Sequence, residues 1–415
     1  MSSPASSPPA GAAPDAPGSG RLMCLDALRG FDMFWILGAD ALVHALSEVN
    51  GSGVAKFLAG QLDHRAWEGF TFYDLIFPLF VFMSGASMTY ALSKHIAQHG
   101  RGGAAKRVLL RGLVIFVIGY FYSGGVANPW PDQRLLGVLQ RIALAYTGAG
   151  LLYIYLKPRA LAGVGAAILV AYWALLTFVP IRDFPLDPKA LASRLGTAKP
   201  TLAQVEAAFH ATTARTTGRY EAGYNLTNHL DFQYLPGRRY DTYYDPEGLL
   251  STLPAIVTCL IGVFAGLLMR RTDLAGSDKL RTLLLAGAAG VALGWLWHLQ
   301  FPVIKKIWTS SYVLVAGGYS CWLLAAFYYA IDLRGWRRWC VPLLWIGMNP
   351  ITLYLANNII RFRTFAQRFA GGDVKTWLDA HLGAGAGQGL ITLVALGFTF
   401  LLAWFLHERK IFLRV

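Results

Sequence analysis

The sequence predicts an all-α integral membrane protein, a bundle of about ten transmembrane helices (ten or eleven). Of its 415 residues, 55% are hydrophobic and 14% are charged, whereas a soluble domain has about 25% charged residues. The apolar residues also gather in continuous runs of about 20, the length that a helix needs to cross a bilayer. The formal net charge of +14 does not indicate a nucleic-acid-binding protein, because the basic residues lie between these runs and not on one surface.

Ten segments have the length and composition of membrane spans. They lie near 27–47, 72–92, 108–124, 135–156, 163–180, 250–269, 281–299, 311–331, 340–360 and 388–406. Residues 1–20 are rich in Pro, Ala, Ser and Gly and cannot bury a core, so we expect a disordered cytoplasmic tail. Residues 21–415 should form one membrane domain with two long outer loops, 48–71 and 181–247.

The basic residues predict the orientation. If the N-terminal tail is cytoplasmic, the inner segments hold 19 Lys and Arg residues and the short outer loops hold 9. Cytoplasmic loops carry the excess of Lys and Arg in membrane proteins. Both termini are therefore expected in the cytoplasm.

A few ionisable residues lie inside or beside the spans. With this topology, Asp40, Asp74 and Arg141 share the outer half of the membrane, and His64 lies in the loop between the first two spans. A charge in a span costs about 2.5–3.5 kcal/mol on insertion scales and indicates a functional site by default. Imidazole serves as a general base or as a nucleophile. The histidines form no cluster with ligand-like spacing, so we expect no metal.

Each of these residues also has a structural interpretation. Asp40 and Arg141 could form a buried ion pair that holds two helices in register. Asp74 follows the segment FTFY and could cap a helix, while Arg29 could contact lipid headgroups at the inner surface. His64 could be a solvated loop residue, but its segment, LDHRAWEGF, is short and aromatic and leads directly into an acidic helix start.

Several segments resemble one known family. RLMCLDALRGFDMFWIL (21–37) resembles the opening of the transmembrane acyltransferase superfamily, and in particular the heparan-α-glucosaminide N-acetyltransferase family in its bacterial short form. The similarity continues, in the same order, through HRAWEGFTFYDLIFPLFVFMSGAS (64–87), GVLQRIALAY (137–146), YDPEGLLSTLPAIVTCLIGVFAG (244–266), PVIKKIWTSSYVL (302–314) and MNPITLY (348–354).

The resemblance implies an activity and a set of residues. Such enzymes move an acetyl group from cytosolic acetyl-CoA to the amine of a glucosamine on the far side of the membrane. The family's catalytic histidine matches His64, and Trp67 follows it in the motif. Asp40 stands where the animal enzyme has an asparagine, and a carboxylate there could orient His64. Lys305 and Trp308 match a K-x-x-W motif and Asn349 an M-N turn, and both motifs are expected to line the cavity.

The resemblance also implies where substrates bind. We expect acetyl-CoA to enter from the cytoplasm, with its phosphates near inner cations such as Arg29, Arg107 or Arg338, and to reach the level of His64, Asp74 and Arg141. The expected location is the bacterial inner (plasma) membrane. Lipid, acetyl-CoA and an amino sugar are the expected partners, and a homodimer is one possible assembly. Tyrosines of loop 181–247 could contact sugar rings, or the loop could be only a packed lid.

A secondary transporter of sugars or small anions is the alternative class. It would also place charges within the membrane and break its helices there. Two observations disfavour it: the chain shows no paired internal repeat, and the level of the acids and the histidine is in the outer half and not at the midplane.

Overall fold

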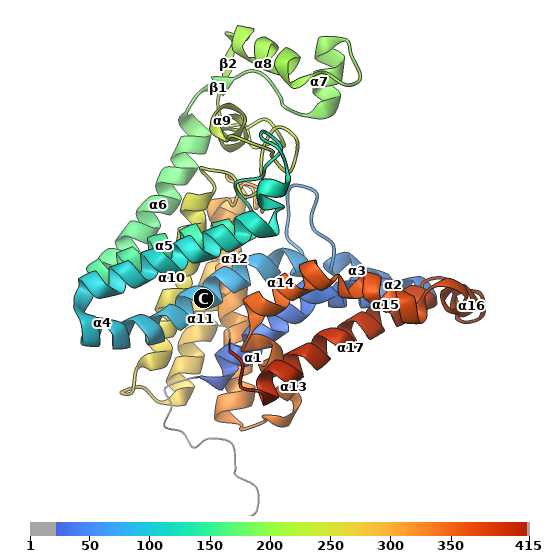
Figure 1. Ribbon diagram of the computed structural model, residues 1–415. Coiled ribbons are helices and arrows are strands. Elements are labelled where there is room, and N and C mark those ends of the chain that lie inside the picture. The colour runs from blue at the N-terminus through green and yellow to red at the C-terminus, as the bar shows by residue number, and fades with distance from the viewer. Residues whose placement is uncertain (1–21, 413–415) are drawn as a thin grey trace, which may run out of the picture.

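The computed structural model describes residues 22–412, and nearly all of its regular structure is helical. The predicted tail, 1–20, lies outside these residues. The main bundle, shown in Figure 1, consists of α1 (Met23–Phe34), α2 (Asp40–Asn50), α4 (Phe72–Tyr122), α5 (Val138–Tyr155), α6 (Pro158–Phe178), α10 (Thr252–Arg270), α11 (Gly276–His298), α12 (Ser310–Phe327), α13 (Val341–Gly347), α14 (Pro350–Ile360) and α17 (Ala386–Glu408). The shorter helices α3 (Gly53–Gln61), α15 (Phe362–Ala370) and α16 (Gly372–Leu382) accompany it. The predicted class, a helical membrane protein, is thus confirmed.

The number of membrane-spanning helices is smaller than predicted when it is counted by helix length and composition. Six helices within residues 22–412 are long and apolar enough to cross a membrane, or seven if α13 and α14, bent by 69°, form one span. This count treats α4 as one helix, although Gly100 has a non-helical backbone (φ 68°, ψ 179°) that separates two arms. Those arms coincide with two of the predicted spans. The count also omits α5 and the α1–α2 pair, so ten spans and the cytoplasmic termini stay predictions.

The first predicted span is interrupted. Between α1 and α2 lies a short π-helix, η1 (Trp35–Ala39), in which Gly38 has φ 110° and breaks the helical path. Such π-turns inside helices frequently occur at functional sites. Here the break lies directly before Asp40, the first residue of α2.

The predicted outer loop 181–247 is a folded layer. It contains α7 (Pro188–Leu195), α8 (Leu202–Ala211), α9 (Leu226–Tyr234) and two short antiparallel strands, β1 (Ile181–Arg182) and β2 (Arg215–Thr216). Figure 1 shows this layer at the end of the bundle opposite α13. Its apolar side chains form a small core of their own, which includes Phe184, Leu191 and Phe209.

Glycines allow the membrane helices to approach closely. A Cβ on Gly262 of α10 would lie 1.8 Å from the carbonyl oxygen of Phe82 in α4, and one on Gly85 would lie 2.0 Å from the carbonyl oxygen of Cys259. Gly266 meets Ala86 in the same way, at 2.5 Å. Small residues bring membrane helices together because no side chain separates the backbones. The G-x-x-x-G pair of α10 therefore packs helices within one chain.

This contact predicts that Gly262→Ala destabilises the protein. The added methyl group would force α4 and α10 apart, and overpacking of this kind costs roughly 1–3 kcal/mol. The melting temperature of the purified protein in detergent should fall. Gly163→Ala in α6 is the matched control, because nothing lies within 4 Å of the added carbon. Equal melting temperatures for the two variants would contradict the close packing.

Candidate active site

A cavity of about 470 Å³ lies between the bundle and the loops at the end that carries residues 181–247. Its apolar wall comes from η1, α1 and α4, through side chains such as Ile36, Phe77 and Phe80. Its polar wall contains His64, Arg134, Glu247 and Lys305, which come from four segments far apart in the chain. The predicted catalytic histidine therefore faces a partly open cavity large enough for part of a substrate.

His64 is placed by two chain segments that pair with each other. Gly69 donates its backbone N–H to the carbonyl oxygen of Val303 (2.9 Å), and Glu68 and Ile304 form an isolated β-bridge. This pairing brings the loop before α4 against the loop before α12. The His64 side chain is about half exposed, at 53%, so its ring can reach a bound molecule.

Asp74 is the carboxylate that contacts His64. Its Oδ1 lies 2.9 Å from His64 Nδ1, while its Oδ2 accepts from the backbone N–H of Thr71 (3.2 Å) and of Arg65 (3.3 Å). Thr71 is the N-cap of α4, and Asp74 completes a capping box with it. The side chain of Asp74 is fully buried. The capping role and the contact with the histidine thus coexist in one residue.

Lys305 is the third member of the cluster. Its Nζ lies 2.9 Å from His64 Nδ1, 3.3 Å from His64 Nε2 and 3.4 Å from Asp74 Oδ1. Burial lowers the pKa of the Lys305 ammonium, and the nearby Asp74 carboxylate partly opposes this effect. A cation therefore stands beside the imidazole at the cavity surface.

The tautomer of His64 depends on its partners. An ionised carboxylate only accepts hydrogen bonds and an ammonium only donates them, so Asp74 and Lys305 favour opposite tautomers at Nδ1. In the tautomer that suits Asp74, the neutral imidazole donates its Nδ1 proton to the carboxylate. Its Nε2 then carries the lone pair. This arrangement matches the one in which a carboxylate orients a catalytic histidine.

Asp40, the carboxylate expected to orient His64, does not appear among its hydrogen-bond partners within residues 22–412. Asp40 instead lies close enough to the Tyr73 hydroxyl to act on it electrostatically. The Tyr73 ring in turn lies 4.7 Å from the His64 ring, between centroids. Any effect of Asp40 on the histidine would therefore pass through Tyr73.

Arg141 is fully buried and lies behind the cavity wall. One guanidinium nitrogen donates to the Gly248 carbonyl oxygen (3.3 Å) and to the Ser251 hydroxyl. The guanidinium also lies over the ring of Trp308, 5.0 Å from its centroid. The ion pair with Asp40 that the sequence allowed is not present among the described residues. Trp308 lines the cavity as expected, whereas Arg141 supports it from behind.

The remaining predicted residues have contacts outside the cavity. Trp67 donates its indole N–H to the Tyr220 carbonyl oxygen (2.8 Å). Asn349 donates to the Ile411 carbonyl oxygen (3.0 Å), although the next two residues, Pro350 and Ile351, line the cavity. Arg29 binds Asp26 (3.0 Å), Ser87 (2.6 Å) and the Gly347 carbonyl oxygen (3.2 Å). Their roles toward a substrate stay predictions.

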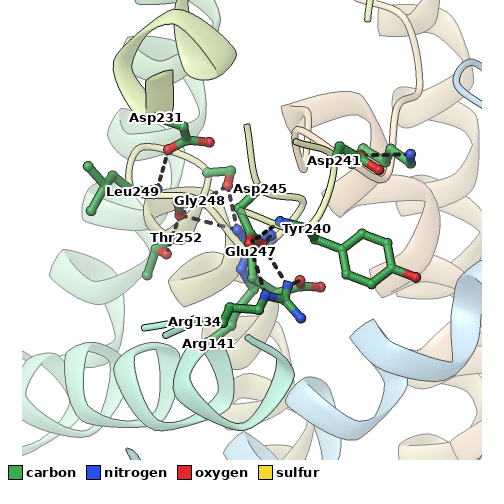
Figure 2. A network of polar contacts seen from close by, with 12 residues as sticks. Arg134, Arg141, Asp231, Tyr240, Asp241, Asp245, Glu247, Gly248, Leu249 and Thr252 are labelled. Atoms are coloured by element: carbon green, nitrogen blue, oxygen red, sulfur yellow. Dashed lines mark hydrogen bonds and ion pairs between the residues drawn. The ribbon is translucent and has the colours of Figure 1, made fainter. Parts of the chain in front are cut away.

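Sequence reasoning missed a network on the far wall of the cavity. Arg134 forms a bidentate ion pair with Asp245 (3.0 and 2.7 Å), and a further contact of 2.7 Å to Glu247. Figure 2 shows that Arg134 and Arg141 both approach the turn that carries these two acids. In the sequence, Arg134 is one of the basic residues of the short outer loops and has no further signal. The acids belong to the segment YDPEG, one of the segments that carries the family resemblance.

No group of three or more His, Cys, Asp and Glu residues that could hold a metal ion occurs between residues 22 and 412. The four cysteines are buried free thiols.

Comparison with known proteins bears on this site. Residues 21–192 match the sequence profile described as heparan-alpha-glucosaminide N-acetyltransferase, catalytic. The resemblance to this family is therefore confirmed. Two similar proteins are the heparan-alpha-glucosaminide N-acetyltransferases of Mus musculus (24% identity over 442 positions, covering 95% of this chain) and Homo sapiens (25% over 395 positions, covering 85%). The chain spans 60% and 55% of the length of these relatives.

The profile match covers only part of the site. It includes His64, in the loop before α4, and Asp74, in the first turn of α4. It ends before Glu247 and Lys305, which complete the cavity.

Behind the cavity, burial raises the pKa of the Asp231 carboxyl group to about 7. An unfolded aspartate has a pKa of about 3.9, so the folded state holds the proton more tightly. Stability should therefore fall as the pH rises from about 4 to about 7.

Asp231→Asn should remove this loss, because the amide stays neutral and its oxygen can still accept from the Leu249 N–H (2.8 Å). Melting temperatures between pH 5 and pH 8 measure the effect. As the pH rises, the melting temperature of the variant should fall less than that of the parent. Asp132→Asn, at an exposed loop position, is the control. Identical pH profiles for Asp231→Asn and the parent would refute the assignment.

Proposed function

We propose that this protein is a transmembrane N-acetyltransferase that moves the acetyl group of acetyl-CoA to the amine of a glucosamine-type sugar. One observation carries the proposal: the cluster of His64, Asp74 and Lys305 presents an imidazole nitrogen and a cation to a cavity of about 470 Å³. The similarity to named N-acetyltransferases supports the choice of reaction. Acetyl-CoA acts as co-substrate, and no step requires a metal.

The chemistry assigns one task to each residue. The neutral amine attacks the thioester carbonyl carbon, and His64 Nε2 takes the proton that the amine loses. The carbonyl oxygen becomes an oxyanion, which the Lys305 ammonium stabilises. The carbon–sulfur bond then breaks, and the imidazolium returns its proton to the departing thiolate. Asp74 stabilises the imidazolium while it exists.

A covalent route uses the same groups in two steps. His64 Nε2 would attack the thioester carbonyl carbon, the carbon–sulfur bond would break, and CoA would leave as its thiolate. The amine would then attack the acetyl-imidazole carbonyl, the bond to Nε2 would break to restore the imidazole, and the proton lost by the amine would neutralise the thiolate. Rapid-quench trapping without acceptor separates the routes, because only the covalent route accumulates acetylated His64.

The proposal includes a direction across the membrane. Acetyl-CoA is taken from the cytoplasm, with its phosphates near inner cations such as Arg29, Arg107 or Arg338, and the sugar is bound on the periplasmic side of a bacterial inner membrane. The apolar wall of the cavity, with Phe77 and Phe80, suits the arm that carries the thioester. A homodimer in lipid is the assembly that we propose.

Replacing His64 with Ala should reduce acetyl transfer at least a thousandfold while acetyl-CoA still binds. The reason is that the variant lacks the group that takes the proton. Mass spectrometry of glucosamine after incubation with isotope-labelled acetyl-CoA measures the product. His210→Ala, at an exposed site of α8, is the control. Near-normal turnover by His64→Ala would show that the histidine has another role.

The contacts of His64 predict that Asp74 contributes more to catalysis than Asp40. Asp74→Asn should lower kcat by roughly 10²–10⁴, because the amide cannot stabilise the imidazolium and favours the wrong tautomer. Asp40→Asn should cost only a few-fold, since it acts through Tyr73. Melting temperatures check that Asp74→Asn still folds. A larger loss for Asp40→Asn would make Asp40 the carboxylate partner of the histidine.

A further inference from the structure

The wall of the cavity that lies outside the profile match carries a second acid. Glu247 lines the same cavity as His64. It lies near enough to Lys305 to interact with it electrostatically, so both residues can contact one bound molecule. Its side chain is 12% exposed. The chemistry proposed above does not use it.

Glu247 is held in place by its neighbours. Asp245 occupies two nitrogens of Arg134 and accepts the backbone N–H groups of Tyr240 and Glu247, both at 3.0 Å. Arg134 then fixes Oε2 of Glu247 at 2.7 Å. Burial raises the pKa of Glu247, and the Asp245 carboxyl group close to it adds to this effect. Among residues 22–412 the hydrogen-bond donor to Glu247 is Arg134, at Oε2, so the Oε1 oxygen can accept from a ligand.

Tyr240 supplies an aromatic face next to this acid. Its ring lies over the guanidinium of Arg134, 5.0 Å from the central carbon, and its side chain is 66% exposed. It also lines the cavity, and Figure 2 shows the ring extending away from the acids. Of the six tyrosines of the outer layer that could contact sugars, Tyr240 is the one that reaches the cavity; Tyr243 and Tyr244 are buried in the core of that layer.

We propose that Glu247 and Tyr240 form the acceptor subsite and bind the ring of the amino sugar while its amine lies at His64. The inference rests on the proposed function and adds to it the group that recognises the acceptor. Sugar hydroxyls donate hydrogen bonds to the Glu247 carboxylate, and the C–H face of the ring packs on Tyr240. Arg134 positions the carboxyl group through its contact with Oε2. Burial raises the pKa of Glu247, and the nearby Arg141 and Arg134 partly oppose this effect.

The same geometry distinguishes acceptors by their hydroxyl groups. A hydroxyl-rich acceptor carries donors that satisfy the carboxylate, whereas a simple amine such as cyclohexylamine leaves it unpaired. A site built to bind hydroxyl groups rejects an analogue that lacks them, because its buried acceptor loses its partner.

Binding of radiolabelled glucosamine to the purified full-length protein tests the subsite without requiring turnover. Glu247→Gln keeps the size of the side chain and should raise the Kd at least tenfold, and Tyr240→Ala should raise it several-fold. The matched controls are Glu221→Gln and Tyr234→Ala. Both come from the outer layer and lie outside the cavity lining, and Tyr234 is also 66% exposed. Acetyl-CoA binding should be the same in all four variants.

A second measurement compares acceptors. In the parent, kcat/KM should favour glucosamine over cyclohexylamine, and Glu247→Gln should reduce this ratio at least tenfold by lowering glucosamine turnover alone. Unchanged glucosamine affinity in both Glu247→Gln and Tyr240→Ala overturns the subsite, even if the parent acetylates glucosamine. Binding that depends on Glu247 without any acetylation supports the subsite and overturns the proposed function. A parent that does not bind glucosamine overturns both.

Discussion

The buried carboxylate of Asp74 is the constraint on which the site depends. Its two oxygens are divided between tasks, since Oδ2 caps the first turn of α4 and Oδ1 contacts His64. Its own backbone carbonyl accepts from the Tyr312 hydroxyl (2.8 Å), which ties α4 to α12. A fully buried carboxylate without such partners would be strongly destabilising. The start of the longest helix and the orientation of the histidine are therefore set by one group.

The remaining parts of the site are brought to Asp74 by backbone contacts between distant segments. The β-bridge between Glu68 and Ile304 delivers Lys305, which lies next to the bridge in sequence. The turn at residues 245–248 is fastened by Arg134 to the segment before α5 and by Arg141 to α5 itself. Ser251, the N-cap of α10, contacts both Arg141 and the Gly248 carbonyl oxygen. The cavity is consequently walled by segments that are far apart in the chain but are each fixed by buried polar contacts.

The helical class that the sequence predicted is confirmed, because long apolar runs determine it. The level of the site in the membrane, which rests on the rare charges, stays a prediction. Each of the ten predicted spans is helical, including the two arms of α4 that Gly100 separates. Depth along a helix does not reveal the direction in which a side chain points. For this reason the sequence favoured Asp40 as the residue that orients His64 and Asp74 as a helix cap, whereas the structure places Asp74 against His64.

Other features depended on tertiary contacts that no local pattern contains. Loop 181–247 has little apolar periodicity, yet it folds into a layer with its own core around Phe184 and Phe209. Glu247 follows a proline in a loop and gave no signal as a ligand, because its significance comes from Arg134, more than 100 residues earlier. Arg29, assigned to acetyl-CoA from its depth, has its recorded contacts with Asp26, Ser87 and Gly347.

The most direct test of the account separates donor and acceptor across a membrane. Proteoliposomes with one orientation of the protein would hold glucosamine inside and receive acetyl-CoA, labelled on the acetyl group, from the cytoplasmic face. We predict that labelled N-acetylglucosamine forms in the lumen, that no acetyl-CoA enters, and that His64→Ala abolishes the product. Passage of glucosamine without acetyl-CoA, with no labelled product, would contradict the account and identify a transporter.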